Sequence, residues 1–150
     1  MSATHDTSKL DDLIITTIDS IKGYEHSAEH ARSAEYASFF RDMATDRRHV
    51  VAALQAESSR LGGTPADYGS AAATVHRRIE DIRRVLGGGD GAILGEIERG
   101  EDYLKEEFER VLADDRTSAE TQRVVRDCFA SVRRGHDAAR ELKHAFKSAA

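Results

Sequence analysis

Residues 93–108 read ILGEIERGEDYLKEEF, and their apolar positions recur every three or four residues. In an α-helix each residue turns the chain by about 100°, so this spacing gathers them into one stripe along a helix face. The stripe comprises Leu94, Ile97, Leu104, Phe108 and Val111. Glu101 lies in the middle of it. Because an unpaired charge is costly to bury, this carboxylate must be paired with a cation, bound to a metal or held neutral.

The composition is that of a helical protein with a single domain. The 150 residues are 39% hydrophobic and 33% charged, with one proline, and such a chain can bury a core without disulfides. The net charge of −5 argues against general nucleic-acid binding, which needs a basic face. The basic pairs Arg77-Arg78 and Arg133-Arg134 are short, and we interpret them as solvated helix faces.

Cysteine usage and hydropathy bear on the compartment. Cys128 is the single cysteine, so no internal disulfide can form, and a reducing compartment is expected. We expect its thiol to be packed in the core. The N-terminus lacks the apolar core of a signal peptide, and no run approaches the roughly 20 apolar residues of a membrane span. The sequence therefore predicts a cytoplasmic protein without membrane association.

Breakers and capping residues divide the chain into helices. Residues 1–7 are polar and are expected to be disordered, so the predicted domain spans residues 8–150. We predict helices over residues 8–32, 34–61, 72–86 and 90–113 and from residue 117 onward. Capping residues mark four of the starts, namely Ser8 with Asp11, Ser33, Asp90, and Thr117 with Glu120. Glycine-rich breakers follow the second and third helices, at residues 62–65 and 87–89.

These helices predict an all-α fold, an antiparallel four-helix bundle. Short turns join the first two long helices and the last two, which makes each pair antiparallel neighbours. The shorter helix over residues 72–86 then forms a crossover between the second and third long helices. Gly23 weakens the first helix, and we expect it to mark a close approach by another helix.

Each predicted hairpin brings an acid from its first helix and a base from its second to the inward face. The first hairpin offers Glu25 and Arg47, and the second offers Glu101 and His136. A turn centred near Ser33 places Arg47 about two helical turns from the level of Glu25, so their contact depends on the stagger of the helices. Glu101 and His136 lie within roughly one turn of each other.

Four stretches carry a resemblance to a known family: IKGY at residues 21–24, LGGTP at 61–65, VHR at 75–77 and ERGED at 98–102. They resemble an uncharacterised bacterial four-helix-bundle family, named only as a domain of unknown function and placed with the ferritin-like proteins. The resemblance covers residues 10–142. It implies a ferritin-like fold, a bacterial and stress-related setting, and association into dimers or larger assemblies.

Ferritin-like di-iron proteins supply one Glu from each of two helices and a Glu-x-x-His pair from each of the other two. By this resemblance Glu25 and Glu101 match the lone glutamates. In the fourth helix the Glu-x-x-His pair corresponds to residues 133 and 136. His136 matches the histidine, but Arg133 stands in place of the Glu. Arg47 stands at a ligand position of the second helix. Arginine cannot ligate a metal, but its guanidinium can bridge two carboxylates.

Two hypotheses of function follow. In the first, Glu25, Arg47, Glu101 and His136 form a buried ionic cluster that replaces the metal site. The protein is then non-enzymatic, binds no cofactor and acts by association with itself or with another protein. In the second, it is an oxidase or an iron-handling protein in which Glu25, Glu101 and His136 hold iron or manganese. A rotation or stagger of the helices that brings the acids to solvent is the structural alternative to both.

A separate pair of histidines lies on the first helix. His26 and His30 have the His-x-x-x-His spacing, which places both rings on one helix face. Such a pair can bind a divalent transition metal at the surface. A solvated polar face is the alternative interpretation.

Overall fold

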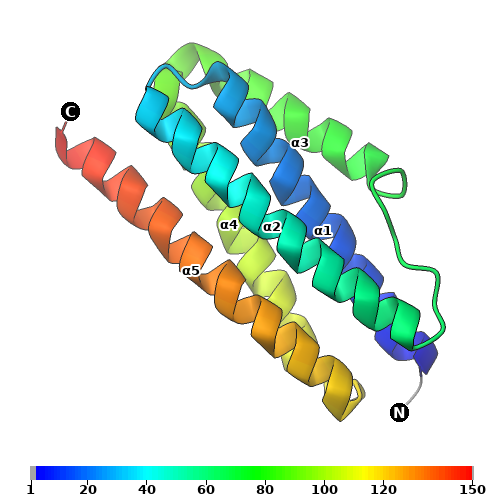
Figure 1. Cartoon of the computed structure of the whole chain (residues 1–150). Helices are drawn as coiled ribbons and strands as arrows, with labels where there is room; N and C mark the ends of the chain where they lie inside the picture. The colour runs from blue at the N-terminus through cyan, green and yellow to red at the C-terminus, as the bar shows by residue number, and fades with distance from the viewer. Residues whose placement is uncertain (1–2, 150) are drawn as a thin grey trace.

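The computed structural model describes residues 3–149, and within that range it holds five α-helices and no strand (Figure 1). The helices are α1 Ala3–His30, α2 Ala34–Arg60, α3 Ala72–Val85, α4 Gly89–Leu112 and α5 Ala119–Ala149, with a 3₁₀ turn η1 at Leu86–Gly88. The long helices α1, α2, α4 and α5 lie along one another as a bundle, and α3 lies beside α1 (Figure 1). The predicted all-α bundle is confirmed.

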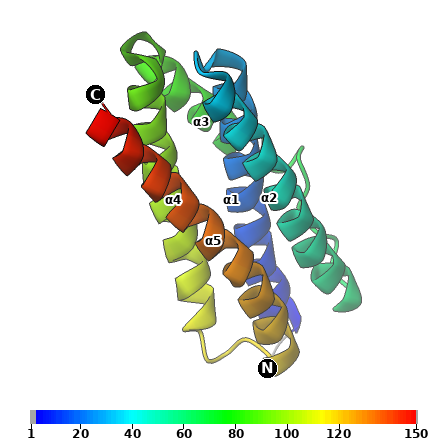
Figure 2. The ribbon, with the colours of Figure 1, turned by 60° about the vertical axis from the view of Figure 1, so that its left-hand side comes forward.

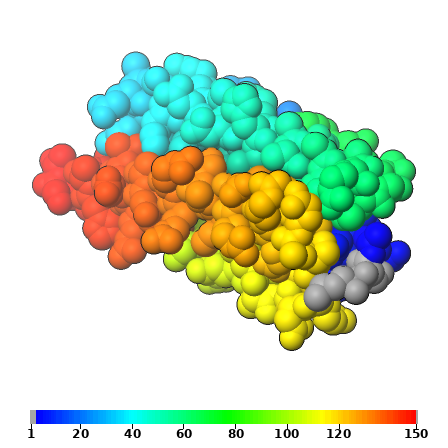
Figure 3. All heavy atoms as spheres, turned by 60° about the horizontal axis from the view of Figure 1, so that its bottom comes forward, coloured from blue at the N-terminus to red at the C-terminus, as the bar shows by residue number. Residues whose placement is uncertain are grey.

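The core forms where the apolar stripes of the long helices meet. Each fully buried leucine, isoleucine or phenylalanine contributes about 1.5–3 kcal/mol relative to an exposed position. The largest of these side chains are Leu10, Leu13, Ile14, Ile18, Ile21, Phe40, Leu54, Ile93 and Phe108. Figure 2 shows α5 crossing in front of α4 and α1, and in Figure 3 its C-terminal turns project beyond α2.

The start of α1 differs from the prediction. The helix begins at Ala3, and Asp6 is buried with only 1% of its surface exposed. One Asp6 oxygen accepts the backbone N–H of Ser118 at 3.1 Å, and the other lies 3.3 Å from the Thr121 hydroxyl, which is closer to Glu57 at 2.7 Å. An acid of α1 therefore caps α5, a contact between residues 112 positions apart that no local pattern reveals. The expected disorder is corrected for residues 3–7, while Met1 and Ser2 lie outside the described residues.

Two predicted helix starts have different outcomes. The Ser33 hydroxyl accepts the backbone N–H of Tyr36 and caps α2, as predicted. Asp90 does not cap α4, because that helix already begins at Gly89. Its carboxylate accepts the backbone N–H groups of Arg32 at 2.8 Å and Ser33 at 2.9 Å. Asp90 thus ties the α1–α2 turn to the start of α4.

Within residues 3–149, no helix combines the length and the apolar character that crossing a membrane requires.

Candidate functional site

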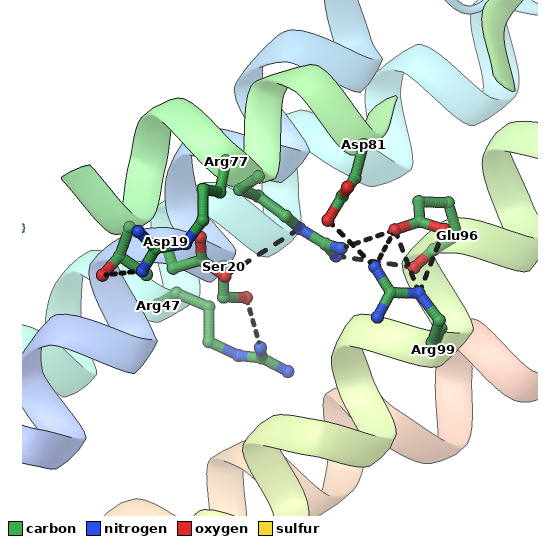
Figure 4. Close-up of polar contacts among 9 residues, drawn as sticks. Asp19, Ser20, Arg47, Arg77, Asp81, Glu96 and Arg99 are labelled. Atoms are coloured by element: carbon green, nitrogen blue, oxygen red, sulfur yellow. Dashed lines mark hydrogen bonds and ion pairs between the residues drawn. The ribbon is translucent and has the colours of Figure 1, made fainter. Parts of the chain in front are cut away.

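A buried ion pair joins α2 to α4 in the middle of the bundle. Arg47 of α2 is fully buried, and Glu101 of α4 is 2% exposed. Nη2 of Arg47 donates to both carboxylate oxygens of Glu101 at 2.8 Å. Nη1 donates to the Ser20 hydroxyl of α1 at 2.8 Å, a bond visible in Figure 4. Nη2 also lies 3.5 Å from the Val132 carbonyl of α5, so the guanidinium contacts all the long helices.

Tyr24 of α1 completes this arrangement. Its hydroxyl donates to Glu101, and the Arg47 guanidinium lies 5.9 Å from the centre of its ring. Burial and the adjacent Glu101 carboxylate raise the pKa of Tyr24 well above its usual value, so Tyr24 remains a donor. Burial alone lowers the pKa of Arg47, but Glu101 and Tyr24 raise it above its ordinary value. We call Ser20, Tyr24, Arg47 and Glu101 the central cluster.

A glycine on α5 makes room for the guanidinium. A Cβ added at Gly135 would lie 2.6 Å from Nη2 of Arg47 and 2.4 Å from the terminal methyl of Met43. Real Cβ atoms do not approach neighbours so closely. The absence of a side chain at Gly135 therefore lets α5 close over the central cluster.

Glu25 does not join the central cluster, contrary to the expectation. Its carboxylate pairs with Lys22 at 3.1 Å and with Arg48, and its side chain is 34% exposed. Tyr24, not Glu25, continues the buried stripe of α1, so Glu25 lies at the edge of the α1–α2 contact. Partial burial alone raises the pKa of the Glu25 carboxyl, but the bonds from Lys22 and Arg48 hold it below its usual value.

His136 is buried but bonds to other acids than expected. Its Nε2 lies 2.7 Å from Asp102 and its Nδ1 lies 3.2 Å from Asp137. Asp102 follows Glu101 on α4, and one residue turns the direction of a side chain by about 100°. His136 therefore meets the exposed edge of α4 and makes no bond to Glu101 among those described.

These positions bear on a ferritin-like metal centre. Arg47 and Tyr24 occupy the oxygens of Glu101, Glu25 bonds at the surface, and His136 bonds to Asp102. We compared the positions of the possible metal ligands, the His, Cys, Asp and Glu side chains, across residues 3–149. One group of three brings its ligand atoms within 4.8 Å of one another, and it consists of His26, Glu29 and His30. The set Glu25, Glu101 and His136 does not converge and does not fit such a centre.

A second buried arginine lies between α1, α3 and α4. Arg78 of α3 is 7% exposed, and its Nη1 donates to Glu96 at 3.2 Å. Its Nε lies 3.9 Å from Asp19. A Cβ at Gly23 would lie 2.8 Å from Arg78, and one at Gly100 would lie 1.9 Å from it. The approach expected at Gly23 is thus made by the Arg78 side chain.

Arg78 corrects the interpretation of the Arg77-Arg78 pair as a solvated face. Arg77 is exposed, but Arg78 is buried. A sequence signal for this was available. Arg78 lies three residues after Val75 and four before Ile82, so it belongs to the apolar stripe of α3.

A cavity of about 220 Å³ opens beside Arg78. Its lining includes Asp19, Arg77, Asp81, Arg99 and Tyr103. Arg99 pairs with Asp81 at 3.1 Å and also with Glu96 (Figure 4). Burial raises the pKa of Asp19 to about 6, although Arg78 acts in the opposite direction. Asp19 is therefore a carboxyl whose ionisation is unfavourable in the folded protein.

We expect Asp19→Asn to stabilise the protein at pH 8 but not at pH 4. The folded pKa of about 6 exceeds the ordinary value of 3.8, so folded Asp19 holds its proton to higher pH than unfolded Asp19. Its ionisation thus lowers stability as pH rises from about 4 to about 6, and the loss is complete above that window. The pKa of about 6 already includes the attraction to Arg78, so the gain at pH 8 should be about 1–3 kcal/mol.

Urea unfolding at the two pH values measures this difference. The exposed Asp42→Asn is the matched control, and it should change stability little at either pH. An equal effect of Asp19→Asn at pH 4 and pH 8 would show that ionisation of Asp19 is not the cause.

Cys128 is packed against the core, as expected. It is 7% exposed, and burial raises the pKa of its thiol to about 11. A thiol that remains protonated at neutral pH is a poor nucleophile. The residue therefore serves as a small apolar side chain.

Comparison with known proteins identifies one family. The profile of the family described as "Domain of unknown function (DUF2383)" matches residues 6–114. The match spans α1 to the end of α4 and includes every residue of the central cluster. No curated protein matches the chain.

Proposed function

We propose that this chain, which belongs to the DUF2383 family, is a non-enzymatic bundle protein of ferritin-like type whose metal site is replaced by an ionic cluster. One observation carries the proposal: the Arg47 guanidinium contacts both oxygens of Glu101 at 2.8 Å. A fixed positive charge there takes the place of the charge that metals supply in ferritin-like di-iron proteins.

The central cluster gives the bundle its register. Replacing a buried ion pair by apolar groups is often neutral or stabilising. A gain in stability therefore does not explain why this protein has a buried ion pair. Its polar partners come from α1, α2 and α4, and each bond is made at one axial position of the helices. A slide of one helix along another would leave buried polar groups unpaired, which is costly.

The protein then acts through association, as a homodimer or with a protein partner. The resemblance to ferritin-like proteins, which pair along helix faces, supports this part of the proposal. It also supports a stress-related role in the cytoplasm of a bacterium. Neither a nucleic acid nor a membrane is among the proposed partners, given the net charge of −5.

The alternative is an iron or manganese oxidase, or an iron-handling protein, that uses Glu25, Glu101 and His136. It requires Glu25 to leave Arg48 and Arg47 to leave Glu101. Breaking the Arg47–Glu101 pair would leave the positive guanidinium of Arg47 close to the incoming metal ions, and these like charges would repel each other. We therefore favour the non-enzymatic bundle protein over this metal-binding alternative.

Metal analysis of the untagged chain decides between the two. The protein is purified without chelators and analysed for iron and manganese before and after anaerobic incubation with Fe²⁺. We expect neither metal to be retained in stoichiometric amounts. Two irons per chain that are lost in Glu101→Gln would establish the alternative.

Sedimentation equilibrium of the same sample tests the proposed association. We expect a mass near twice the 16.5 kDa of one chain. A monomer at every concentration would exclude the homodimer.

A further inference from the structure

The last two turns of α1 bring three potential metal ligands together. One ligand atom from each of His26, Glu29 and His30 lies within 4.8 Å of the other two. The residues are spaced at i, i+3 and i+4, which places them on one face of a helix. This face is separate from the central cluster, because neither histidine bonds to its members.

The hydrogen bond of His30 prepares its other nitrogen for coordination. Its Nδ1 lies 2.9 Å from the carbonyl oxygen of His26. A carbonyl only accepts, so Nδ1 carries the proton and Nε2 of the neutral ring has a free lone pair. Metal-bound histidines are commonly oriented by such a bond from the second nitrogen.

His26 offers a ligand on the inner side of the group. Its side chain is 13% exposed, its Nδ1 lies 4.0 Å from Glu29, and its ring centre lies 4.5 Å from that of His30. Its Nε2 is buried and has no hydrogen-bond partner among the described residues.

We propose that His26, Glu29 and His30 bind one divalent transition-metal ion of the zinc class, with water at the remaining position. Two imidazoles and a carboxylate suit Zn²⁺, Cu²⁺ or Ni²⁺ better than Mg²⁺ or Ca²⁺, which prefer oxygen ligands. Glu29 is 72% exposed, so its carboxylate can move to close the distance to the two rings. Arg83 of α3 is the nearby cation, and Glu80 pairs with it at 3.0 Å.

Calorimetric titration of the untagged full chain with ZnCl₂ at pH 7.5 tests the site. We expect one zinc per chain, with affinity reduced about tenfold or more in His30→Ala and in Glu29→Ala. Both residues are exposed, so these variants should keep the fold. His49→Ala removes an exposed histidine of α2 and should leave zinc affinity unchanged.

Two further measurements separate this site from other binding. Co²⁺ should give the visible absorption of a nitrogen-ligated ion in the native chain and lose it in His30→Ala. Zinc should raise Tm in the native chain but not in His30→Ala. Absence of saturable zinc binding, or equal binding in the native chain and His30→Ala, would overturn the proposal. Zinc binding lost only in His136→Gln would overturn it as well.

Discussion

Replacing Arg47 with methionine should lower the free energy of unfolding by about 3–5 kcal/mol, the usual cost of removing one partner of a buried ion pair. Methionine fills much of the space but carries no charge. Glu101, which is 2% exposed in the native protein, is then a buried carboxylate with Tyr24 as its remaining donor. The Ser20 hydroxyl loses a partner as well. Urea unfolding at pH 7, followed by circular dichroism, measures the loss.

Two further variants identify the cause of that loss. The double variant Arg47→Met/Glu101→Leu removes both charges and should recover most of the stability, because paired apolar replacements are often neutral. Arg48→Met removes the exposed neighbouring arginine and should change stability by about 0.5 kcal/mol or less. A double variant less stable than Arg47→Met alone would show that the uncompensated Glu101 charge is not the source of the loss.

Gly100→Ala should destabilise the protein by about 2 kcal/mol, within the range of overpacked cores. The new methyl would lie 1.9 Å from Nη2 of Arg78, which is buried between Gly23 and Gly100. Arg78 must shift to make room, and the shift disturbs its contacts with Glu96 at 3.2 Å and Asp19 at 3.9 Å. Thermal and urea unfolding both measure the change.

Gly95→Ala is the matched control on the same helix. No atom lies within 4 Å of a Cβ at Gly95, so the substitution should stabilise α4 by about 0.5–1 kcal/mol. The two substitutions are chemically identical and are expected to have opposite signs. If Gly100→Ala also stabilised the protein, the Arg78 side chain could not be held as tightly as the structure shows.

Much of the fold could be predicted because its causes are local. The apolar stripes of α1, α2, α4 and α5 and the glycine-rich breakers lie in continuous sequence. The ends of helices depended on distant partners and were predicted less well. Asp90 bonds to the α1–α2 turn rather than capping its own helix, and Asp6 caps a helix that begins far along the chain.

The site was predicted where a polar residue lies at the centre of a stripe. Arg47 and Glu101 occupy such positions, and the structure brings them together. Glu25 and His136 were assigned partners only one residue from the correct ones. The structure pairs Glu25 with Arg48 and His136 with Asp102, because a step of one residue rotates the side chain by about 100°. Tyr24 was overlooked because an aromatic residue in an apolar stripe gives no sign of its hydroxyl bond.

The cap that Asp6 provides to α5 has a consequence for folding during synthesis. Among the helices α1 is synthesised first, and Ser118, whose backbone N–H Asp6 accepts, is added only 112 residues after Asp6. The entropy lost on closing a loop increases with its length, and this contact closes a loop of most of the chain. The α1–α2 hairpin can form while translation continues, but the bundle is completed only when the start of α5 docks on the first turns of α1.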